Sequence, residues 1–280
     1  MYLYHQAFLA CFIHLYTKTM KKSNIFYVLG AIILIFMLMD CGDKKDKKTN
    51  AQTDQEIQII QDEVLINNLS EDEVQGGWKL LFDGKTTNGW RGFNADTIST
   101  GWIVEDGCLM TLGKGGDIGG DIITEEEFEN FELKWEWKIS ATGNSGILYR
   151  VLEGDYPAVY ATGPEYQLID DIGFPQKLEK WQTTGANYAM HPPQNAKIKP
   201  VGKWNSSKIL INGSHVEHWL NGEKVVEYEL WSDEWKENVN SGKWKEYPGY
   251  GLASKGHISL QDHGSKVWFR NIKIRELNDE

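Results

Sequence analysis

The stretch FELKWEWKI, residues 131–139, alternates apolar and charged side chains over its whole length. Successive side chains of an extended strand point to opposite faces, so the Phe, Leu, Trp and Ile residues share one face. The pattern predicts a long β-strand with its apolar face in the core, and it places Glu132 and Glu136 on a solvated face.

Shorter runs of strand-forming residues recur along the chain. Asp-Gly and Asn-Gly dipeptides accept the positive φ values of a hairpin turn, and they join consecutive runs at Asp106-Gly107, Asn212-Gly213 and Asn221-Gly222. The other predicted strands are residues 78–82, 102–105, 108–111, 146–151, 163–170, 207–211, 215–220, 224–228, 257–261 and 267–274.

Little helix is expected. Ser70-Glu71-Asp72-Glu73 is a capping-box pattern for a short helix that ends at Gly76-Gly77, and a second short helix is expected at residues 231–239. Strands and helices do not alternate along the chain, which excludes a parallel-sheet fold. The many short strands predict an all-β sandwich of two antiparallel sheets. Residues 171–200 are proline-rich and are expected to form an irregular excursion that walls a site.

Composition narrows the classes of function. The net charge of −11 disfavours binding to nucleic acid. The 3 cysteines form neither a disulfide framework nor a CxxC metal pair. The glycine-rich segment 113–120 matches neither phosphate-loop spacing, so a loop between strands explains it better.

The N-terminal region has the pattern of an export signal. The segment from Met20 to Asn24 is basic through Lys21 and Lys22, and the largely apolar residues 25–39 follow it. This order is typical of a secretory signal peptide, and the apolar run is too short for a membrane span. Leu38-Met39-Asp40-Cys41 resembles a bacterial lipobox, with Asp40 in place of the usual small residue. Cys41 is therefore the predicted lipidation site, and the alternative is an uncleaved anchor.

These features predict three parts of the chain. Residues 1–41 form the signal and lipoprotein segment, with Met20 as the true start, and residues 42–69 form a flexible polar tether. Residues 70–280 form the folded domain. We expect the protein to be exported and anchored to a bacterial membrane only through its N-terminal lipid.

A set of short motifs resembles one known family across residues 78–277. The motifs are residues 81–85, 89–90, 131–133, 136–137, 144–147, 163–167, 199–202, 204–205, 219–222, 256–264 and 269–272. In this order they are similar to the 3-keto-disaccharide hydrolase domain, which is also described as a 3-keto-glucoside 1,2-lyase and 2-hydroxy-glucal hydratase domain. The resemblance implies a concanavalin-like or laminin-G-like jelly roll, in agreement with the strand pattern.

The activity that the resemblance implies is cleavage of 3-keto-glycosides by 1,2-elimination and hydration, a net hydrolysis of the glycosidic bond. The partner is then a carbohydrate substrate, and a separate sugar 3-oxidase is expected upstream. Two alternatives stay open: a non-catalytic sugar-binding module on the same fold, and an ordinary glycosidase with two carboxylates.

The implied reaction needs particular groups. A ketone at C3 makes the proton on C2 acidic, so the site needs a base near C2, an acid near the leaving oxygen and a donor or metal at the enolate. Glu165 is the first candidate for acid or base, and Gln167 shares its face of the strand and would hold a hydroxyl group. The alternative is that both residues belong to a solvated outer face.

Further candidates lie on neighbouring predicted strands. Arg150 would stabilise an enolate or pair with a neighbouring glutamate. His257, Gln261 and, if the strand continues, His263 share one face, where a histidine pair beside a carboxylate would bind a divalent metal or act as acid and base. The alternative for His263 is a turn residue bound to backbone groups.

The predicted catalytic residues are therefore Glu165, His263 and Arg150, and the predicted substrate-binding residues are Gln167, Gln261, His257, Asp170 and Asn144. These residues assign no cofactor with certainty and leave a divalent metal open.

Overall fold

The computed structural model describes residues 66–114 and 120–277. The predicted signal segment, the lipidation site Cys41 and most of the predicted tether lie outside the described residues. The strands are β1 (Lys79–Leu80), β2 (Trp90–Gly92), β3 (Trp102–Glu105), β4 (Cys108–Thr111), β5 (Ile122–Phe128), β6 (Phe131–Ile139), β7 (Asn144–Val151), β8 (Glu165–Ile169), β9 (Asn205–Asn212), β10 (His215–Leu220), β11 (Glu223–Glu229), β12 (Gly256–Leu260) and β13 (Val267–Glu276). The helical segments are α4 (Glu71–Gln75), η2 (Val159–Ala161), η3 (Lys180–Gln182), α5 (Asp233–Ser241) and η4 (Lys243–Glu246).

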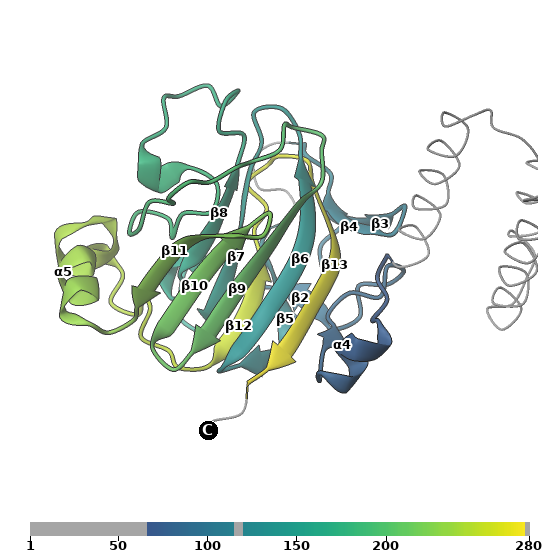
Figure 1. Ribbon diagram of the computed structural model, residues 1–280, viewed down its shortest axis with the longest axis horizontal. Helices are drawn as coiled ribbons and strands as arrows, with labels where there is room; N and C mark the ends of the chain where they lie inside the picture. The colour runs from purple at the N-terminus through teal and green to yellow at the C-terminus, as the bar shows by residue number, and fades with distance from the viewer. Residues whose placement is uncertain (1–65, 115–119, 278–280) are drawn as a thin grey trace, which may run out of the picture. The chain divides into compact units, whose positions relative to one another are not determined.

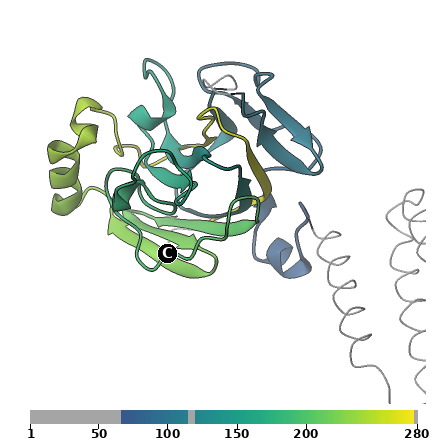
Figure 2. The ribbon, with the colours of Figure 1, turned by 90° about the horizontal axis from the view of Figure 1, so that it is seen from above.

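Two antiparallel sheets stack face to face (Figures 1 and 2). The large sheet has eight strands in the order β11-β10-β9-β6-β13-β4-β3, with β1 paired to β13. The small sheet has five strands in the order β2-β5-β12-β7-β8. The predicted two-sheet β-sandwich is therefore confirmed.

The strand β6 covers the whole alternating stretch and lies between β9 and β13 in the large sheet. All five of its apolar side chains are buried against the small sheet or its neighbours. The hairpin β3–β4 and the meander β9–β10–β11 also form as predicted. Asn221 and Gly222 have φ values of 50° and 87°, as a two-residue hairpin turn requires.

The strands β2 and β5 have no counterpart among the predicted strands. Three successive glutamates, residues 125–127, interrupt the alternation in β5. The pairing of β5 with β12 also shifts register between His257 and Ser259, which indicates a bulge. A bulge changes which side chains face the core, so a period-two pattern does not reveal such a strand.

The outer face of β6 is not simply solvated, which corrects the prediction for Glu132. Its side chain lies 3.3 Å from Lys208 Nζ and also pairs with Arg275, and the residue is buried. Glu136 pairs with Arg270 at 2.6 Å. The charges of this face therefore neutralise one another across neighbouring strands.

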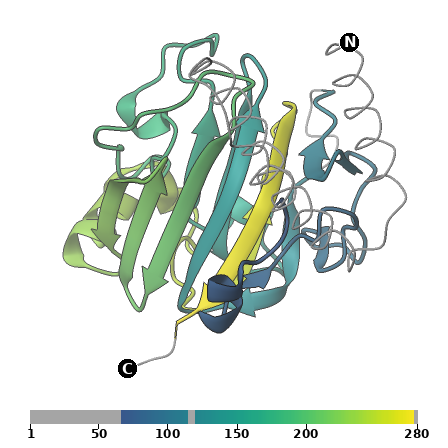
Figure 3. The ribbon, with the colours of Figure 1, turned by 45° about the vertical axis from the view of Figure 1, so that its right-hand side comes forward.

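The folded part begins before the predicted boundary at Ser70. Asn67 is buried, exchanges hydrogen bonds of 2.6 and 2.8 Å with Asn271, and donates from Nδ2 to the Gly107 carbonyl at 2.8 Å. The capping box of α4 is present at Ser70 and Glu73, as predicted. Figure 3 shows α4 beside the lower end of β13. Of the described helices, none combines the length and apolar character that crossing a membrane would require.

Hydrogen bonds inside the core join the two sheets. Tyr166 of the small sheet is bonded through its hydroxyl to Ser207 Oγ at 3.0 Å and to the Trp219 carbonyl at 3.1 Å, both in the large sheet. Tyr149, on the neighbouring strand β7, bonds to the Tyr228 hydroxyl and to His218 Nε2. These contacts fix β7 and β8 against the large sheet.

The irregular excursion at residues 171–200 lies beside β8 (teal to green in Figure 1). It hydrogen-bonds along β8, where Tyr188 N donates to the Glu165 carbonyl at 3.0 Å and Gly185 N donates to the Gln167 carbonyl at 2.9 Å. It also reaches β11, where Gln194 N donates to the Val225 carbonyl at 2.8 Å. The excursion thus pairs with the terminal strands of both sheets.

The inter-sheet bonds make a prediction about stability. Tyr166→Phe removes the hydroxyl and leaves buried polar groups with one partner fewer, so the free energy of unfolding should fall by about 1–3 kcal/mol. Urea denaturation measures this change. The partly exposed Tyr156 is the matched control, and Tyr156→Phe should alter stability by less than about 0.5 kcal/mol. Equal effects of the two substitutions would contradict the assigned role of Tyr166.

Candidate active site

A cavity of about 330 Å³ opens on the outward side of the small sheet. Its floor comes from β7 and β8, and its walls come from the segment after β12, the excursion and η4. The lining residues are Gly120, Asp121, Asn144, Ala158, Tyr160, Glu165, Gln167, Tyr188, Lys243, Gln261, Asp262 and His263.

Glu165 and Gln167 reach the cavity because β8 alternates. Tyr166 and Leu168 belong to the core cluster, so the side chains between them point outward. Gly146 on β7 makes room for the carboxylate, since a Cβ atom there would lie 2.4 Å from Glu165 Oε1. The absence of a side chain at Gly146 therefore leaves the space that the carboxylate occupies.

The surroundings of Glu165 favour its neutral form. Burial raises the pKa of its carboxyl group to about 8; the charge of Lys243 partly opposes this shift and that of Asp121 adds to it. The carboxyl group therefore exchanges its proton close to neutral pH, which suits a group that accepts and returns protons.

Three amide side chains line the same cavity as the carboxylate. Gln167 Oε1 accepts from Leu168 N at 2.9 Å, which turns its NH₂ group away from that bond. Asn144 Oδ1 and Gln261 Oε1 are buried, and within residues 66–114 and 120–277 neither has a hydrogen-bond partner. Two buried acceptors without partners beside a cavity are suited to binding hydroxyl groups of a ligand.

Five of the predicted site residues meet at this cavity. They are Glu165, Gln167, Gln261, Asn144 and His263. Glu165, Gln167 and Gln261 are buried, whereas His263 is exposed in the segment that follows β12. The solvated-face alternative for Glu165 and Gln167 is wrong, because both side chains are almost entirely covered.

Arg150 does not line the cavity, which corrects its predicted place in the site. It has a φ of 53° where β7 shifts register against β12. Its guanidinium donates to the Glu129 carbonyl at 2.9 and 3.2 Å and to the Gly213 carbonyl at 3.0 Å. Arg150 thus ties two turns together, and among residues 66–114 and 120–277 it has no salt bridge with a glutamate.

His257 and Asp170 are also outside the cavity lining. His257 Nδ1 bonds to the Thr124 carbonyl at 2.7 Å, at the end of β12 opposite to His263. Six residues of extended chain span about 20 Å, so sharing a face does not bring these histidines together. Burial acts to raise the pKa of the Asp170 carboxyl group, but the backbone N–H bonds that it accepts from Gly173 and Thr142 help to lower the pKa overall.

The aromatic and cationic wall of the cavity could not be recognised from the sequence patterns. Tyr188 comes from the excursion that was expected to wall a site, but no pattern singled it out. Tyr160 follows an irregular segment, and Lys243 begins η4 after α5. Neither residue lies on a predicted strand, so side-chain alternation gave no signal for either one.

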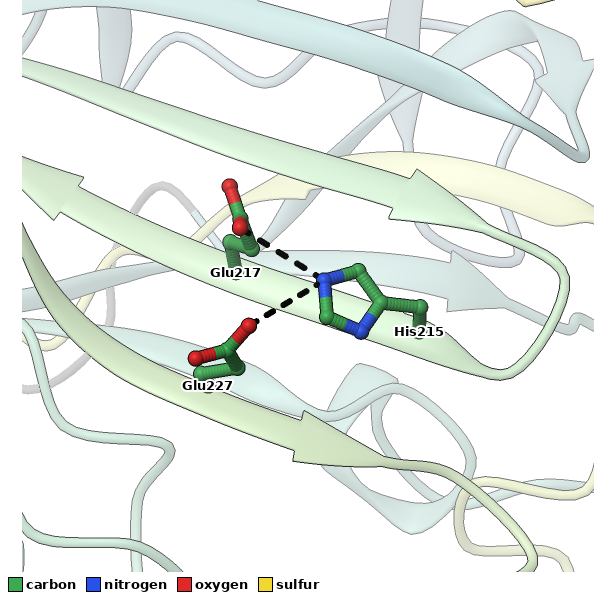
Figure 4. Close-up of side chains that lie close together, drawn as sticks. All are labelled: His215, Glu217 and Glu227. Carbon is green, nitrogen blue, oxygen red and sulfur yellow. Dashed lines mark hydrogen bonds and ion pairs between the residues drawn. The ribbon is translucent and has the colours of Figure 1, made fainter.

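His257 and His263, the histidine pair for which a divalent metal was one possible role, do not lie together at this cavity. Another cluster, on the outer face of the large sheet, brings His215, Glu217 and Glu227 together (Figure 4). His215 Nε2 lies 3.5 and 3.6 Å from the two carboxylates, and Lys224 Nζ lies 3.0 and 2.8 Å from them. Lys224 therefore already supplies the positive charge that this cross-strand pair of glutamates requires.

Comparisons with known proteins agree with this geometry. The sequence model of the 3-keto-alpha-glucoside-1,2-lyase-like domain family matches residues 77–275. A 3-keto-disaccharide hydrolase of Bacteroides thetaiotaomicron is 36% identical over 295 residues, which cover 92% of this chain and 100% of that protein.

Two crystal structures from Parabacteroides distasonis, both provisionally assigned as glycosyl hydrolases, share the fold. The first is 47% identical with a TM-score of 0.72 and covers 76% of this chain and 100% of that one. The second is 29% identical with a TM-score of 0.56 and covers 71% of this chain and 99% of that one.

The raised pKa of Glu165 predicts a pH-dependent stability. Between about pH 4.5 and pH 8 the folded protein keeps a proton that the unfolded chain has lost. The stability from this proton is therefore fully present below pH 4.5, the ordinary pKa, and is lost as the pH rises through 8. Glu165→Gln stays neutral, so it should be more stable than the wild type at about pH 9 by several kcal/mol, at about 1.4 kcal/mol for each pKa unit.

Chemical denaturation at a series of pH values measures this difference, which should shrink towards about pH 5. The exposed Glu125 is the matched control, and Glu125→Gln should follow the wild type at each pH. A stability difference for Glu165→Gln that does not change with pH would contradict the assignment.

Proposed function

The chain belongs to the 3-keto-alpha-glucoside-1,2-lyase-like domain family, and from this membership we propose that it cleaves 3-keto-disaccharides at the glycosidic bond. The named activity of the Bacteroides relative supports glycoside cleavage as the overall reaction. The route that we propose is elimination across C1 and C2, followed by addition of water.

The observation that carries this proposal is the buried Glu165 carboxyl group on the floor of the cavity, whose pKa burial raises to about 8. A C3 ketone acidifies the neighbouring C2–H bond. The Glu165 carboxylate takes the C2 proton, and the electron pair moves onto the C3 oxygen as an enolate. A carboxylate with a raised pKa is a stronger base than an ordinary one, which favours this step.

The enolate then collapses and expels the substituent at C1. The C1–O bond breaks, its electron pair goes to the aglycone oxygen, and that oxygen takes up a proton. Water adds to C1 of the resulting enone and a proton returns to C2, so the products are 3-keto-glucose and the free aglycone. His263, exposed at the cavity, is the candidate for proton transfer to the leaving oxygen.

The amide groups have a binding role in this proposal. Asn144, Gln167 and Gln261 supply oxygen acceptors and NH₂ donors around Glu165. Hydroxyl groups of a hexose ring would fill the bonds that Asn144 Oδ1 and Gln261 Oε1 lack within the described part of the chain. Such contacts would hold C2 over the base.

An ordinary two-carboxylate glycosidase is the competing function, because Asp121 and Asp262 also line the cavity. Asp121 Oδ1 accepts from Asp262 N at 3.0 Å, and Asp262 Oδ1 accepts from Gly264 N at 2.9 Å. These bonds use carboxylate oxygens to order the segment after β12, which favours the proposal with one base. A sugar-binding module without turnover is the other alternative.

The proposal also includes the cellular setting. Export and lipid attachment at Cys41 would place the domain outside the cytoplasm, where glycans are available. The ketone must be made before cleavage, so a separate sugar 3-oxidase has to act first. Neither point affects the test of the reaction itself.

The substrate preference tests the proposed function. The wild type should release 3-keto-glucose from a 3-keto-disaccharide and leave the unoxidised disaccharide intact, because only the ketone acidifies C2. Glu165→Gln should lower kcat by at least about 1,000-fold, since an amide cannot accept the C2 proton. Product release is followed by chromatography. Equal turnover of both sugars would support the two-carboxylate alternative, and binding without turnover would support the binding module.

The close approach at Gly146 makes a second prediction. Gly146→Ala places a methyl group where Glu165 Oε1 lies, and the flexible glutamate side chain can move away. The protein should therefore fold, while kcat falls about 10–100-fold because the base is displaced. Thermal unfolding of Gly146→Ala is the control, because a lower kcat counts only if the variant keeps the wild-type folding transition. Full activity of Gly146→Ala would contradict the position assigned to the carboxylate.

A further inference from the structure

One charged wall residue has no part in the reaction so far. Among the described residues around the cavity, Lys243 alone carries a permanent positive charge. Its Nζ lies 4.5 Å from the ring centroid of Trp244, 4.7 Å from that of Tyr188 and 5.5 Å from that of Tyr160. Three ring faces at these distances attract a cation and limit where it can move.

The backbone beneath this lysine is firmly held. Trp244, the next residue, is fully buried and stacks on Tyr250 with ring centroids 4.1 Å apart. Trp244 Nε1 also donates to the Tyr188 carbonyl at 3.2 Å, which joins η4 to the excursion. Lys243 itself is an exposed residue, but the tryptophan that follows it is part of the core.

The charge of Lys243 is not matched by a contact. Within the described part of the chain no carboxylate lies within 4.0 Å of Nζ. Burial lowers the pKa of the Lys243 ammonium group, and the charge of Glu165 acts to raise it. Glu165 and Lys243 thus lie in one cavity without touching. The space between an acid and a cation is where a reacting group would sit.

We propose that Lys243 binds the C3 oxygen of the substrate and stabilises the enolate that forms there. The inference rests on the proposed function and adds to it the group that receives the developing charge. When Glu165 takes the C2 proton it becomes neutral, and the negative charge moves to the C3 oxygen. Lys243 keeps its proton throughout and donates a hydrogen bond to that oxygen. The negative charge that faces its ammonium group is thus on Glu165 before the proton transfer and on the substrate after it.

A structural role is the alternative, in which the stem of Lys243 merely covers aromatic rings. That role would not depend on the ammonium charge during reaction. Lys243→Met keeps the stem and removes the charge, whereas Lys243→Arg keeps a cation. Lys245, two residues along the same turn and exposed, gives the matched control Lys245→Met.

The experiment separates formation of the enolate from cleavage. A 3-keto C-glycoside has no glycosidic oxygen at C1, so the proposed cleavage is blocked while the C2 proton can still exchange with solvent. NMR in D₂O follows this exchange. Lys243→Met should slow exchange and lower kcat on the 3-keto-disaccharide, each about 100-fold, with little change in KM. Lys243→Arg should retain part of both rates, and Lys245→Met should match the wild type.

Several outcomes would overturn the inference. Exchange at the wild-type rate in Lys243→Met, or loss of cleavage without loss of exchange, would show that Lys243 does not stabilise the enolate. A higher KM with unchanged kcat would assign it to uniform binding. If the wild type neither exchanges nor cleaves, the proposed function itself fails. Thermal unfolding of Lys243→Met and Lys243→Arg checks that both variants fold.

Discussion

The site depends on hydrogen bonds that two tyrosines make inside the core, between the two sheets. Tyr149 and Tyr166 lie on neighbouring strands of the small sheet, and their hydroxyl groups bond to partners in the large sheet. A bond of this kind is costly to leave unmade once water is excluded. Because a shift of one residue would exchange the two faces of β8, these bonds also determine that Glu165 points outward.

Burial shifts the pKa of two titratable groups in this fold, with different consequences for each. His218 is fully buried, and burial lowers its pKa to about 3, so it stays neutral while both ring nitrogens are bonded, to Tyr149 and to the Gly185 carbonyl. Glu165 is almost as buried but borders a cavity, with a cation in the opposite wall. The neutral histidine strengthens the core, whereas the carboxyl group can exchange its proton with a molecule in the cavity.

Side-chain alternation accounts for what could be predicted. It located β6 at its full length, the hairpins, and the outward face that carries Glu165 and Gln167. It failed where the backbone departs from regular pairing, as in β5 and at Arg150, whose positive φ turns its side chain away from the site. It also gave no information on Lys243, because the place of a residue from a short turn depends on tertiary packing.

The excursion at residues 171–200 has a consequence for how this protein can change. It supplies Tyr188 to the cavity and also pairs with β8 and β11, the terminal strands on one side of the sandwich. Unpaired terminal strands readily add strands from other molecules. Shortening or exchanging this segment to admit a larger glycan would therefore leave β8 and β11 free to pair with strands of other molecules. A change in substrate range at this segment would thus also change the tendency of the protein to aggregate.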